Sequence, residues 1–336
     1  MIDRSPARPS FTVVRADLAQ GAAPSEHALD GAVVAIGNFE GVHRGHRTVI
    51  DVALARGREL TRRSAVLTFE PHPRAVFRPD EPVFRLSGEA AKLRLLARTG
   101  VDGVIVMRFD AALAALSAED FVRRILVERF AVAGVVVGFD FHFGKGRAGS
   151  PAFLEAAGRA HGFTVDIVPA FSDGGTRISS GAVRAALAAG EVEAAAAMLG
   201  YPWFVTGTVV HGDKRGRDLG FPTANLRLDP ACALKQGIYA VRVGIGGKRH
   251  DGVANFGRRP MFDTGVVLLE VFLFDFDRDI YGETIDVAFI HWIRPEMTFA
   301  SVDDLVRRMG EDCGLARAAL ARAPQAFPPI GPPGSP

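Results

Sequence analysis

The chain has 336 residues, enough for about two domains, and its 48% hydrophobic and 23% charged content is typical of a soluble globular protein. The formal net charge of +2 argues against a general nucleic-acid binder. Cys232 and Cys313 lack the spacing of a metal or redox motif. Met1–Ser10 is polar and no apolar run approaches the ~18 residues of a membrane span, so we expect a cytoplasmic protein. We also expect a monomer or a transient homo-oligomer.

The first half of the chain alternates short apolar strands with helical patterns. After an irregular segment over residues 1–30, strands are predicted over 32–36, 65–69, 103–108, 133–138 and 164–168. Helices are predicted over 47–60, 89–98, 118–130 and 151–161. This alternation predicts an α/β domain with a parallel sheet covered by helices on both faces, where ligands bind at the carboxyl ends of the strands.

The second half has a different pattern. An alanine-rich helix is predicted over 181–199, and Gly200-Tyr-Pro202 ends it. Strands follow over 204–210, 238–245, 251–256, 266–274 and 284–292, then a helix over 302–322. We therefore expect a first domain over 1–185, a linker helix over 186–200, an antiparallel barrel or sandwich with a terminal helix over 201–323, and a disordered Pro/Gly-rich tail over 324–336.

A basic, glycine-rich loop follows the first strand of the second domain. The run His211-Gly-Asp-Lys-Arg-Gly-Arg-Asp-Leu-Gly-Phe-Pro-Thr-Ala-Asn225 brings cationic side chains together with glycines that let the backbone approach a ligand. In an extended chain, Thr223 and Asn225 point to the same side, and their oxygens suit a phosphate-bound Mg²⁺. Without further context, a solvated basic hairpin loop is the alternative.

Two histidines lie between the first confident strand of the α/β domain and the helix after it. His43 and His46 are three residues apart, so they share one face of the first helical turn, and Gly45 permits a close approach of ligand. Imidazole donors at the positive end of a helix suit the charge on a phosphate under attack. The alternatives are a surface or capping pair, or a metal site, for which no third ligand is evident.

A single carboxylate interrupts the apolar strand over 266–274. Glu270 shares its face with Leu268 and Phe272, so it is either directed to solvent or buried for a purpose. Desolvation makes a carboxylate a better proton acceptor, which suits a general base for an alcohol that attacks a phosphate.

These motifs resemble those of bifunctional bacterial riboflavin kinase/FMN adenylyltransferases (FAD synthetases). The glycine-rich run resembles the ATP signature of riboflavin kinases, Leu269-Glu-Val-Phe-Leu-Phe-Asp-Phe276 resembles their catalytic strand, and Gly252-Val-Ala-Asn-Phe-Gly-Arg-Arg-Pro260 resembles their flavin-side loop. The adenylyltransferase motifs are resembled by Gly37-Asn-Phe-Glu-Gly-Val-His-Arg-Gly-His46, Thr68-Phe-Glu-Pro-His-Pro73, Val137–Gly146 and Thr176-Arg-Ile-Ser-Ser-Gly-Ala-Val-Arg184.

The resemblance implies a Rossmann-like nucleotidylyltransferase domain, a barrel-shaped riboflavin kinase domain, and riboflavin, FMN and Mg-ATP as ligands. It implies catalytic roles for Glu270, His43 and His46, with Mg²⁺ at Thr223 and Asn225. The implied ATP and phosphate contacts are Asn38, Gly45, Ser179, Ser180, Arg184, Gly212, Lys214, Gly216, Arg217 and Gly220. The implied flavin contacts are Asp140, Asn255, Arg258 and Arg259.

Three positions depart from the family pattern. Glu40 stands where the family has Asp, Gly181 where it has Thr, and Met261-Phe-Asp263 where it has Thr-Phe-Gly. Two alternatives follow: a riboflavin kinase whose adenylyltransferase domain is impaired, and a flavin-binding carrier or regulator without turnover. The His43/His46 pair and Glu270 argue against the carrier, because a binding protein needs no general base.

Overall fold

The computed structural model describes residues 11–20, 24–212, 220–258 and 267–331. It divides into two compact units, one built from residues up to Pro82 together with Lys92–Ile178, and the other from Val83–Ala91 together with the chain from Ser179 onward. No helix in the described ranges is long and apolar enough to cross a membrane.

The first unit is built on a parallel sheet of six strands in the order β1-β4-β3-β2-β5-β6. The strands are β1 (Thr12–Ala16), β2 (Val33–Ile36), β3 (Ser64–Glu70), β4 (Gly103–Arg108), β5 (Gly134–Gly138) and β6 (Thr164–Val168). The four residues of β2 are all buried, as expected for a central strand covered on both faces. Strand order reverses at β2, which lies between β3 and β5, so ligand binding is expected at the carboxyl ends of these strands.

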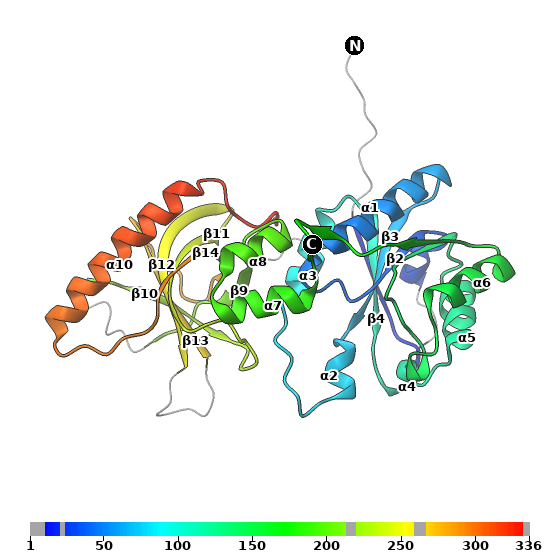
Figure 1. Cartoon of the computed structure of the whole chain (residues 1–336), viewed down its shortest axis with the longest axis horizontal. Coiled ribbons are helices and arrows are strands. Elements are labelled where there is room, and N and C mark those ends of the chain that lie inside the picture. Colours follow the sequence, from blue (N-terminus) through cyan, green and yellow to red (C-terminus); the bar gives the residue numbers. More distant parts are fainter. Residues whose placement is uncertain (1–10, 21–23, 213–219, 259–266, 332–336) are drawn as a thin grey trace, which may run out of the picture. The chain divides into compact units, whose positions relative to one another are not determined.

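Helices cover both faces of this sheet (Figure 1). Figure 1 shows α1 and α3 on one side and α5 and α6 on the other. The helices of the unit are α1 (Arg44–Glu59), α2 (Pro73–Phe77), α3 (Glu89–Ala97), α4 (Ala111–Ala114), α5 (Ala118–Asp120), the π-helical continuation of α5 over Phe121–Arg129, and α6 (Pro151–His161). A two-stranded hairpin, β7 (Ser172–Asp173) and β8 (Thr176–Arg177), follows β6.

The expectation that residues 1–30 are irregular is wrong in two places, since a 3₁₀ helix forms over Pro24–Leu29 and a strand forms before it. Thr12–Ala16 forms the edge strand β1 and pairs in parallel with β4 over five residues. The segment is short and carries Arg15 among its apolar residues, so its own pattern is weak. Its strand conformation comes from pairing with β4, about ninety residues away in the chain.

The predicted helix over 181–199 is two helices. They are α7 (Ser180–Ala189) and α8 (Val192–Leu199), separated at Gly190. Gly190 has φ +82, and a Cβ there would lie 2.7 Å from Cδ of Lys235. The break between the helices therefore requires glycine at position 190, because the backbone there is left-handed and has no room for a Cβ.

The second unit contains an antiparallel sheet in the order β10-β13-β12-β11-β14-β9. Its strands are β9 (Phe204–Thr208), β10 (Thr223–Leu228), β11 (Gly237–Ile245), β12 (Lys248–Arg258), β13 (Val267–Leu273) and β14 (Thr284–Arg294). A bridge from the Val210 N–H to the Asn225 carbonyl, 2.8 Å, joins the two edges into a nearly closed barrel. The predicted fold class is thus confirmed for both units.

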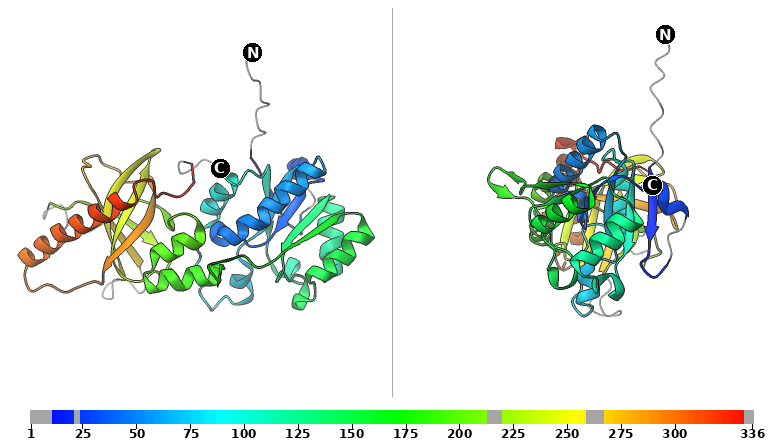
Figure 2. Two further views of the ribbon diagram at one scale, coloured as in Figure 1. Left: turned by 45° about the horizontal axis from the view of Figure 1, so that its top comes forward. Right: turned by 90° about the vertical axis from the view of Figure 1, so that its right-hand side faces the viewer.

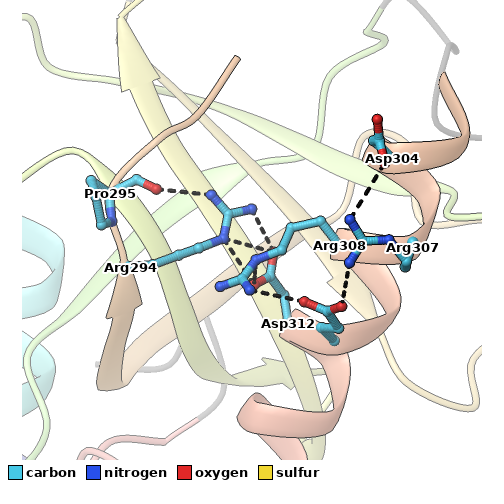
Figure 3. A network of polar contacts seen from close by, with 7 residues as sticks. Arg294, Pro295, Asp304, Arg307, Arg308 and Asp312 are labelled. Carbon is cyan, nitrogen blue, oxygen red and sulfur yellow. Dashed lines mark hydrogen bonds and ion pairs between the residues drawn. The ribbon is translucent and has the colours of Figure 1, made fainter. Parts of the chain in front are cut away.

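The terminal helix α10 (Val302–Arg322) runs along the outside of the barrel strands (Figure 2). Buried Arg294 at the end of β14 donates from Nη2 to Oδ2 of buried Asp312 on α10 at 2.6 Å and from Nε to Oδ1 at 2.9 Å. Arg308 approaches the same carboxylate at 3.4 Å (Figure 3). This charge network attaches the helix to the barrel.

The end of α10 is held by buried Arg242 of β11. Its guanidinium donates to the carbonyls of Leu320, Ala323 and Ala326 and to the Asp251 carboxylate. The chain beyond the helix, expected to be a disordered tail, is described as far as Gly331 and contacts the barrel, with the guanidinium of Arg249 over the ring of Phe327.

Candidate functional sites

The turn after β2 has a strained backbone. Phe39 and Val42 adopt positive φ values of 47 and 38, and Gly41 has φ 71. Positive φ is costly for a bulky or β-branched residue, so this conformation persists only where its surroundings impose it. Asn38 begins the turn with an exposed side chain, while its carbonyl accepts a 3.1 Å hydrogen bond from Thr68 Oγ1 on β3.

His43 and His46 lie together at the start of α1. His43 is the N-cap residue, and its Nδ1 accepts the backbone N–H of His46 at 3.1 Å. The two rings stack with centroids 3.6 Å apart, and a Cβ on Gly45 would lie 3.3 Å from the His43 ring. Because Nδ1 of His43 is an acceptor, its neutral ring carries the proton on Nε2 and can donate it to a ligand.

Both imidazoles are neutral near pH 7. Burial lowers the pKa of His43 to about 4. Burial, the neighbouring His43 and the charge of Lys92 hold the pKa of His46 well below its usual value. The pair therefore offers N–H groups and not full positive charges, and the positive end of α1 supplies the electrostatic attraction for an anion. Nδ1 of His46 is buried and has no hydrogen-bond partner among the described residues.

A buried charged cluster lies next to this turn. Lys92 of α3 is 1% exposed, and its Nζ lies 2.7 Å from Oε1 of Glu70. Glu40 is 2% exposed, and its Oε2 lies 3.9 Å from Nε2 of His72. Glu70 and His72 lie within the Thr68–Pro73 motif, but the motif predicts no role for either of them. Lys92 lies outside every motif of the sequence. The rarity of lysine in the chain, five against many arginines, was the one available signal.

Asp140 follows β5 at the carboxyl edge of the same sheet. Its side chain is 59% exposed, and its Oδ2 accepts a hydrogen bond from Arg177 of β8 at 2.6 Å. The Arg177 guanidinium also lies over the Phe139 ring, 5.0 Å from its centroid. On the other strand of the hairpin, Asp173 accepts from Arg44 at the start of α1. Charge pairs therefore connect the β7–β8 hairpin to the start of α1 and to the loop that follows β5.

The second phosphate motif lies at the start of α7, in the second unit. Ser179 is the N-cap, and its hydroxyl accepts from Ala182 N–H at 3.2 Å. Arg184 donates from Nε to the Phe84 carbonyl at 2.6 Å, and burial lowers its pKa. Gly181 meets only Ser179 Oγ, at 3.7 Å from an added Cβ, so a residue with a side chain would fit here.

The barrel places Glu270 between two asparagines. Glu270 of β13 lies opposite Asn225 of β10 and opposite Asn255 of β12. Directly opposite residues in an antiparallel pair project from the same face with their Cβ atoms roughly 5 Å apart, so the three side chains form one polar row. Glu270 is half-buried, on the face of β13 opposite the fully buried Leu269 and Val271.

The amide oxygens of this row are buried, and neither has a hydrogen-bond partner among the residues that the structure describes. Oδ1 of Asn225 and Oδ1 of Asn255 accept no hydrogen bond within the described part of the chain, although a buried amide oxygen normally does. Asn225 Nδ2 donates to the Thr223 carbonyl at 3.2 Å, which holds the amide plane. Oxygen atoms of two amides therefore lie beside a carboxylate. Such oxygens can coordinate Mg²⁺, and the carboxylate can accept the proton of a hydroxyl group.

Gly212 lies against the Asn225 amide, since an added Cβ would be only 2.5 Å from Nδ2. Gly220 has φ +83 at the other end of the loop. The predicted ligands Lys214, Gly216, Arg217 and Arg259 lie outside the described residues, and Arg258 is described only as the last residue of β12. Across the described ranges, no group of three or more His, Cys, Asp or Glu side chains could hold a metal ion.

Comparison with known proteins identifies both halves of the chain. A model of the FAD synthetase family matches residues 25–182, and one of the riboflavin kinase family matches residues 199–320. The bifunctional riboflavin kinase/FMN adenylyltransferase of Escherichia coli strain K12 is 43% identical over 87% of this chain and 94% of its own length. The proteins of the same name from Haemophilus influenzae and Bacillus subtilis are 41% and 35% identical over 90% and 84% of this chain, and 98% and 90% of their own lengths.

A solved structure has the same fold. The crystal structure described as a macrolide-efflux protein from Streptococcus pneumoniae superposes with a TM-score of 0.81 at 32% identity, over 91% of this chain and 99% of that one. With two domain matches in the expected order and relatives that align over most of their length, the resemblance found in the motifs is confirmed. The chain belongs to the family of bifunctional riboflavin kinase/FMN adenylyltransferases.

Proposed function

We propose that this chain phosphorylates riboflavin with ATP to give FMN, and then adenylylates FMN with a second ATP to give FAD and pyrophosphate. Phosphorylation is assigned to the barrel and adenylylation to the parallel-sheet unit. The Asn225–Glu270–Asn255 row supports the proposal most strongly, because it combines a base with unsatisfied oxygen ligands. Family membership supports both activities.

In the kinase step, Glu270 is the general base. Its carboxylate accepts the proton of the ribityl 5′-hydroxyl while that oxygen attacks the γ-phosphorus of ATP, and the bond from the γ-phosphorus to its bridging oxygen breaks to release ADP. The half-buried position of Glu270 leaves it accessible to substrate but partly removed from water. Asn255 and the Arg258–Arg259 segment are assigned to the flavin side of the site.

Thr223 and Asn225 are proposed to hold Mg²⁺ together with the ATP phosphates. The residues fit this role, because Asn225 supplies a buried oxygen without a partner and Thr223 projects from the same side of β10. When bound, the ion neutralises charge on the β- and γ-phosphates and orients them. Gly212, Lys214, Gly216, Arg217 and Gly220 are assigned to the loop that covers the phosphates.

In the adenylylation step, the FMN phosphate oxygen attacks the α-phosphorus of ATP, and the bond to the bridging oxygen breaks to release pyrophosphate. The attacking phosphate is already ionised, so no base is needed, and catalysis depends on positioning and charge stabilisation. His43 donates from Nε2 and His46 lies stacked on it at the start of α1. Asn38, Gly45, Ser179, Ser180 and Arg184 are assigned to ATP, and Asp140 to flavin.

We assign residues 1–185 to adenylyl transfer, 186–200 to a linker that contains the end of α7 and all of α8, 201–323 to the kinase, and 324–336 to a tail. The family matches over 25–182 and 199–320 support this division. It differs slightly from the compact units, because Val83–Ala91 and α7 belong to the second unit.

The deciding experiment separates the products of two incubations by chromatography. Purified protein receives Mg-ATP with riboflavin in one tube and Mg-ATP with FMN in the other. FMN and FAD in the first tube and FAD in the second are expected. FMN without FAD would identify a riboflavin kinase whose adenylyltransferase domain, which carries Glu40 and Gly181, is impaired. Bound flavin without any product would identify a carrier.

A further inference from the structure

The carbonyl of Asn38 is held by two donors that are distant in sequence. Thr68 Oγ1 on β3 donates to it at 3.1 Å, and Lys92 Nζ on α3 lies 3.5 Å from it. Lys92 also donates to Thr68 Oγ1 at 3.2 Å. This carbonyl lies just beyond the end of β2, where sheet pairing stops, so these side chains supply the hydrogen bonds that the sheet no longer provides.

A chain of contacts leads from this carbonyl to the histidine pair. Phe39 follows Asn38 directly, has φ 47 and is 1% exposed. Its ring lies 5.1 Å from that of His46, and His46 stacks on His43. Displacement of the Asn38 peptide would therefore move Phe39, and the ring of Phe39 limits where His46 can lie.

A gain in stability is not enough to explain why a lysine occupies the buried position 92. Lys92 is 1% exposed, and a buried ion pair such as Lys92–Glu70 is often no more stabilising than apolar residues of the same volume. The strained residues Phe39 and Val42 need surroundings that impose their conformation. The ammonium group of Lys92 provides part of these surroundings, because it links α3 to β3 and to the turn after β2.

We propose that Lys92 is a positioning residue for adenylyl transfer, which holds the Asn38–Val42 turn and, through Phe39, sets the position of His46 toward the ATP α-phosphate. The proposal deepens the adenylyltransferase function given above and rests on it. Lys92 touches no reacting atom in this scheme, and Thr68 shares its task through the same carbonyl.

The test uses the full-length chain with three variants and a control. Lys92→Met removes the ammonium and leaves the Glu70 carboxylate, whose side chain is 10% exposed, without that charge partner, which can lower stability. Glu70→Gln/Lys92→Met removes both charges together, and Thr68→Val removes the other donor while it retains the ion pair. Arg56→Met is the control, because it removes a cation from another ion pair of this unit, that with Asp166, away from the turn.

FAD formation from FMN, FMN formation from riboflavin, thermal unfolding and the ¹⁵N imidazole signals of His46 are measured for each. We expect FAD formation to fall roughly 10- to 100-fold in both Lys92 variants and by less in Thr68→Val, as a small misplacement of catalytic groups produces. Kinase turnover should be unchanged, the Arg56→Met control should resemble wild type, and the His46 signals should shift even where the melting temperature is restored.

Wild-type FAD formation in a folded Lys92→Met or in Glu70→Gln/Lys92→Met would overturn the proposal, since Lys92 would then only neutralise Glu70. Where neither variant folds, Thr68→Val decides, because wild-type FAD formation with unmoved His46 signals would exclude a role for the Asn38 carbonyl. A wild-type chain that makes no FAD would instead overturn the adenylyltransferase function, and the Lys92 proposal with it.

Discussion

Glu270 on β13 and Asn255 on β12 are direct cross-strand neighbours, and Asn225 lies on the other side of Glu270. These residues come from three separate stretches of the chain. Pairing of the strands brings one carboxylate and two unsatisfied amide oxygens onto one face, and this arrangement underlies the first two predictions.

Glu270→Gln should lower the turnover of riboflavin by roughly 10²- to 10⁴-fold, because the amide keeps the shape of the side chain but cannot accept the hydroxyl proton. Adenylylation of added FMN should be unaffected, which makes it the internal control for folding. Steady-state assays of both reactions on one preparation measure this. Riboflavin turnover within a factor of two of wild type would rule out Glu270 as the base.

Asn225→Leu should weaken the affinity of the kinase for Mg²⁺. The substitution keeps the volume but removes the buried oxygen that is proposed to hold the ion, so saturation should require a much higher Mg²⁺ concentration. Removal of Mg²⁺ with a chelator should abolish both activities of wild type. A Mg²⁺ titration of kinase rate compares the two proteins, and identical half-saturation would remove Asn225 from the metal site.

His46→Ala should abolish FAD formation and leave the kinase intact, because His46 lies in the first compact unit and Glu270, the proposed base of the kinase, lies in the second. Loss of the ring also removes the stacking partner of His43. Both activities are assayed after the melting temperature has been checked. An equal loss of both activities in a folded variant would contradict two independent sites.

The stability of the first unit should fall as the pH falls from about 6.5 toward 4. His43 has a pKa of about 4 in the folded chain against 6.5 as its ordinary value, so the unfolded chain binds more protons in this window. The contribution is fully present above pH 6.5 and amounts to at most about 3 kcal/mol. Denaturant unfolding at several pH values measures it, with His43→Gln as the comparison. An unchanged pH slope in His43→Gln would show that His43 is not its source.

Asp312→Ala should destabilise the barrel unit by about 3–5 kcal/mol, because Arg294 would remain buried without its carboxylate. Asp275→Ala breaks an exposed pair with Arg317 and should destabilise the unit far less. Urea unfolding of the two variants, followed by loss of kinase activity, compares them. If the two variants lose similar free energies of unfolding, the buried Arg294–Asp312 pair contributes no more to stability than the exposed pair.

The sequence by itself determined the family and the alternation of strands and helices in the first unit, and it singled out the His43/His46 pair and Glu270 as candidate catalytic residues. These depend on local patterns: apolar periodicity, glycine and proline breaks, and motifs of adjacent residues. Edge strand β1 was missed because its conformation depends on pairing with β4, and the break at Gly190 because its crowding comes from Lys235.

Only the tertiary structure decided that Asn225, Glu270 and Asn255 share one row, that both imidazoles are neutral, and that Lys92 lies under the Asn38 turn. The physical reason is the same in each case. Register across strands, desolvation and the burial of a charge are properties of residues that the fold brings together from distant parts of the chain, and no local pattern contains them.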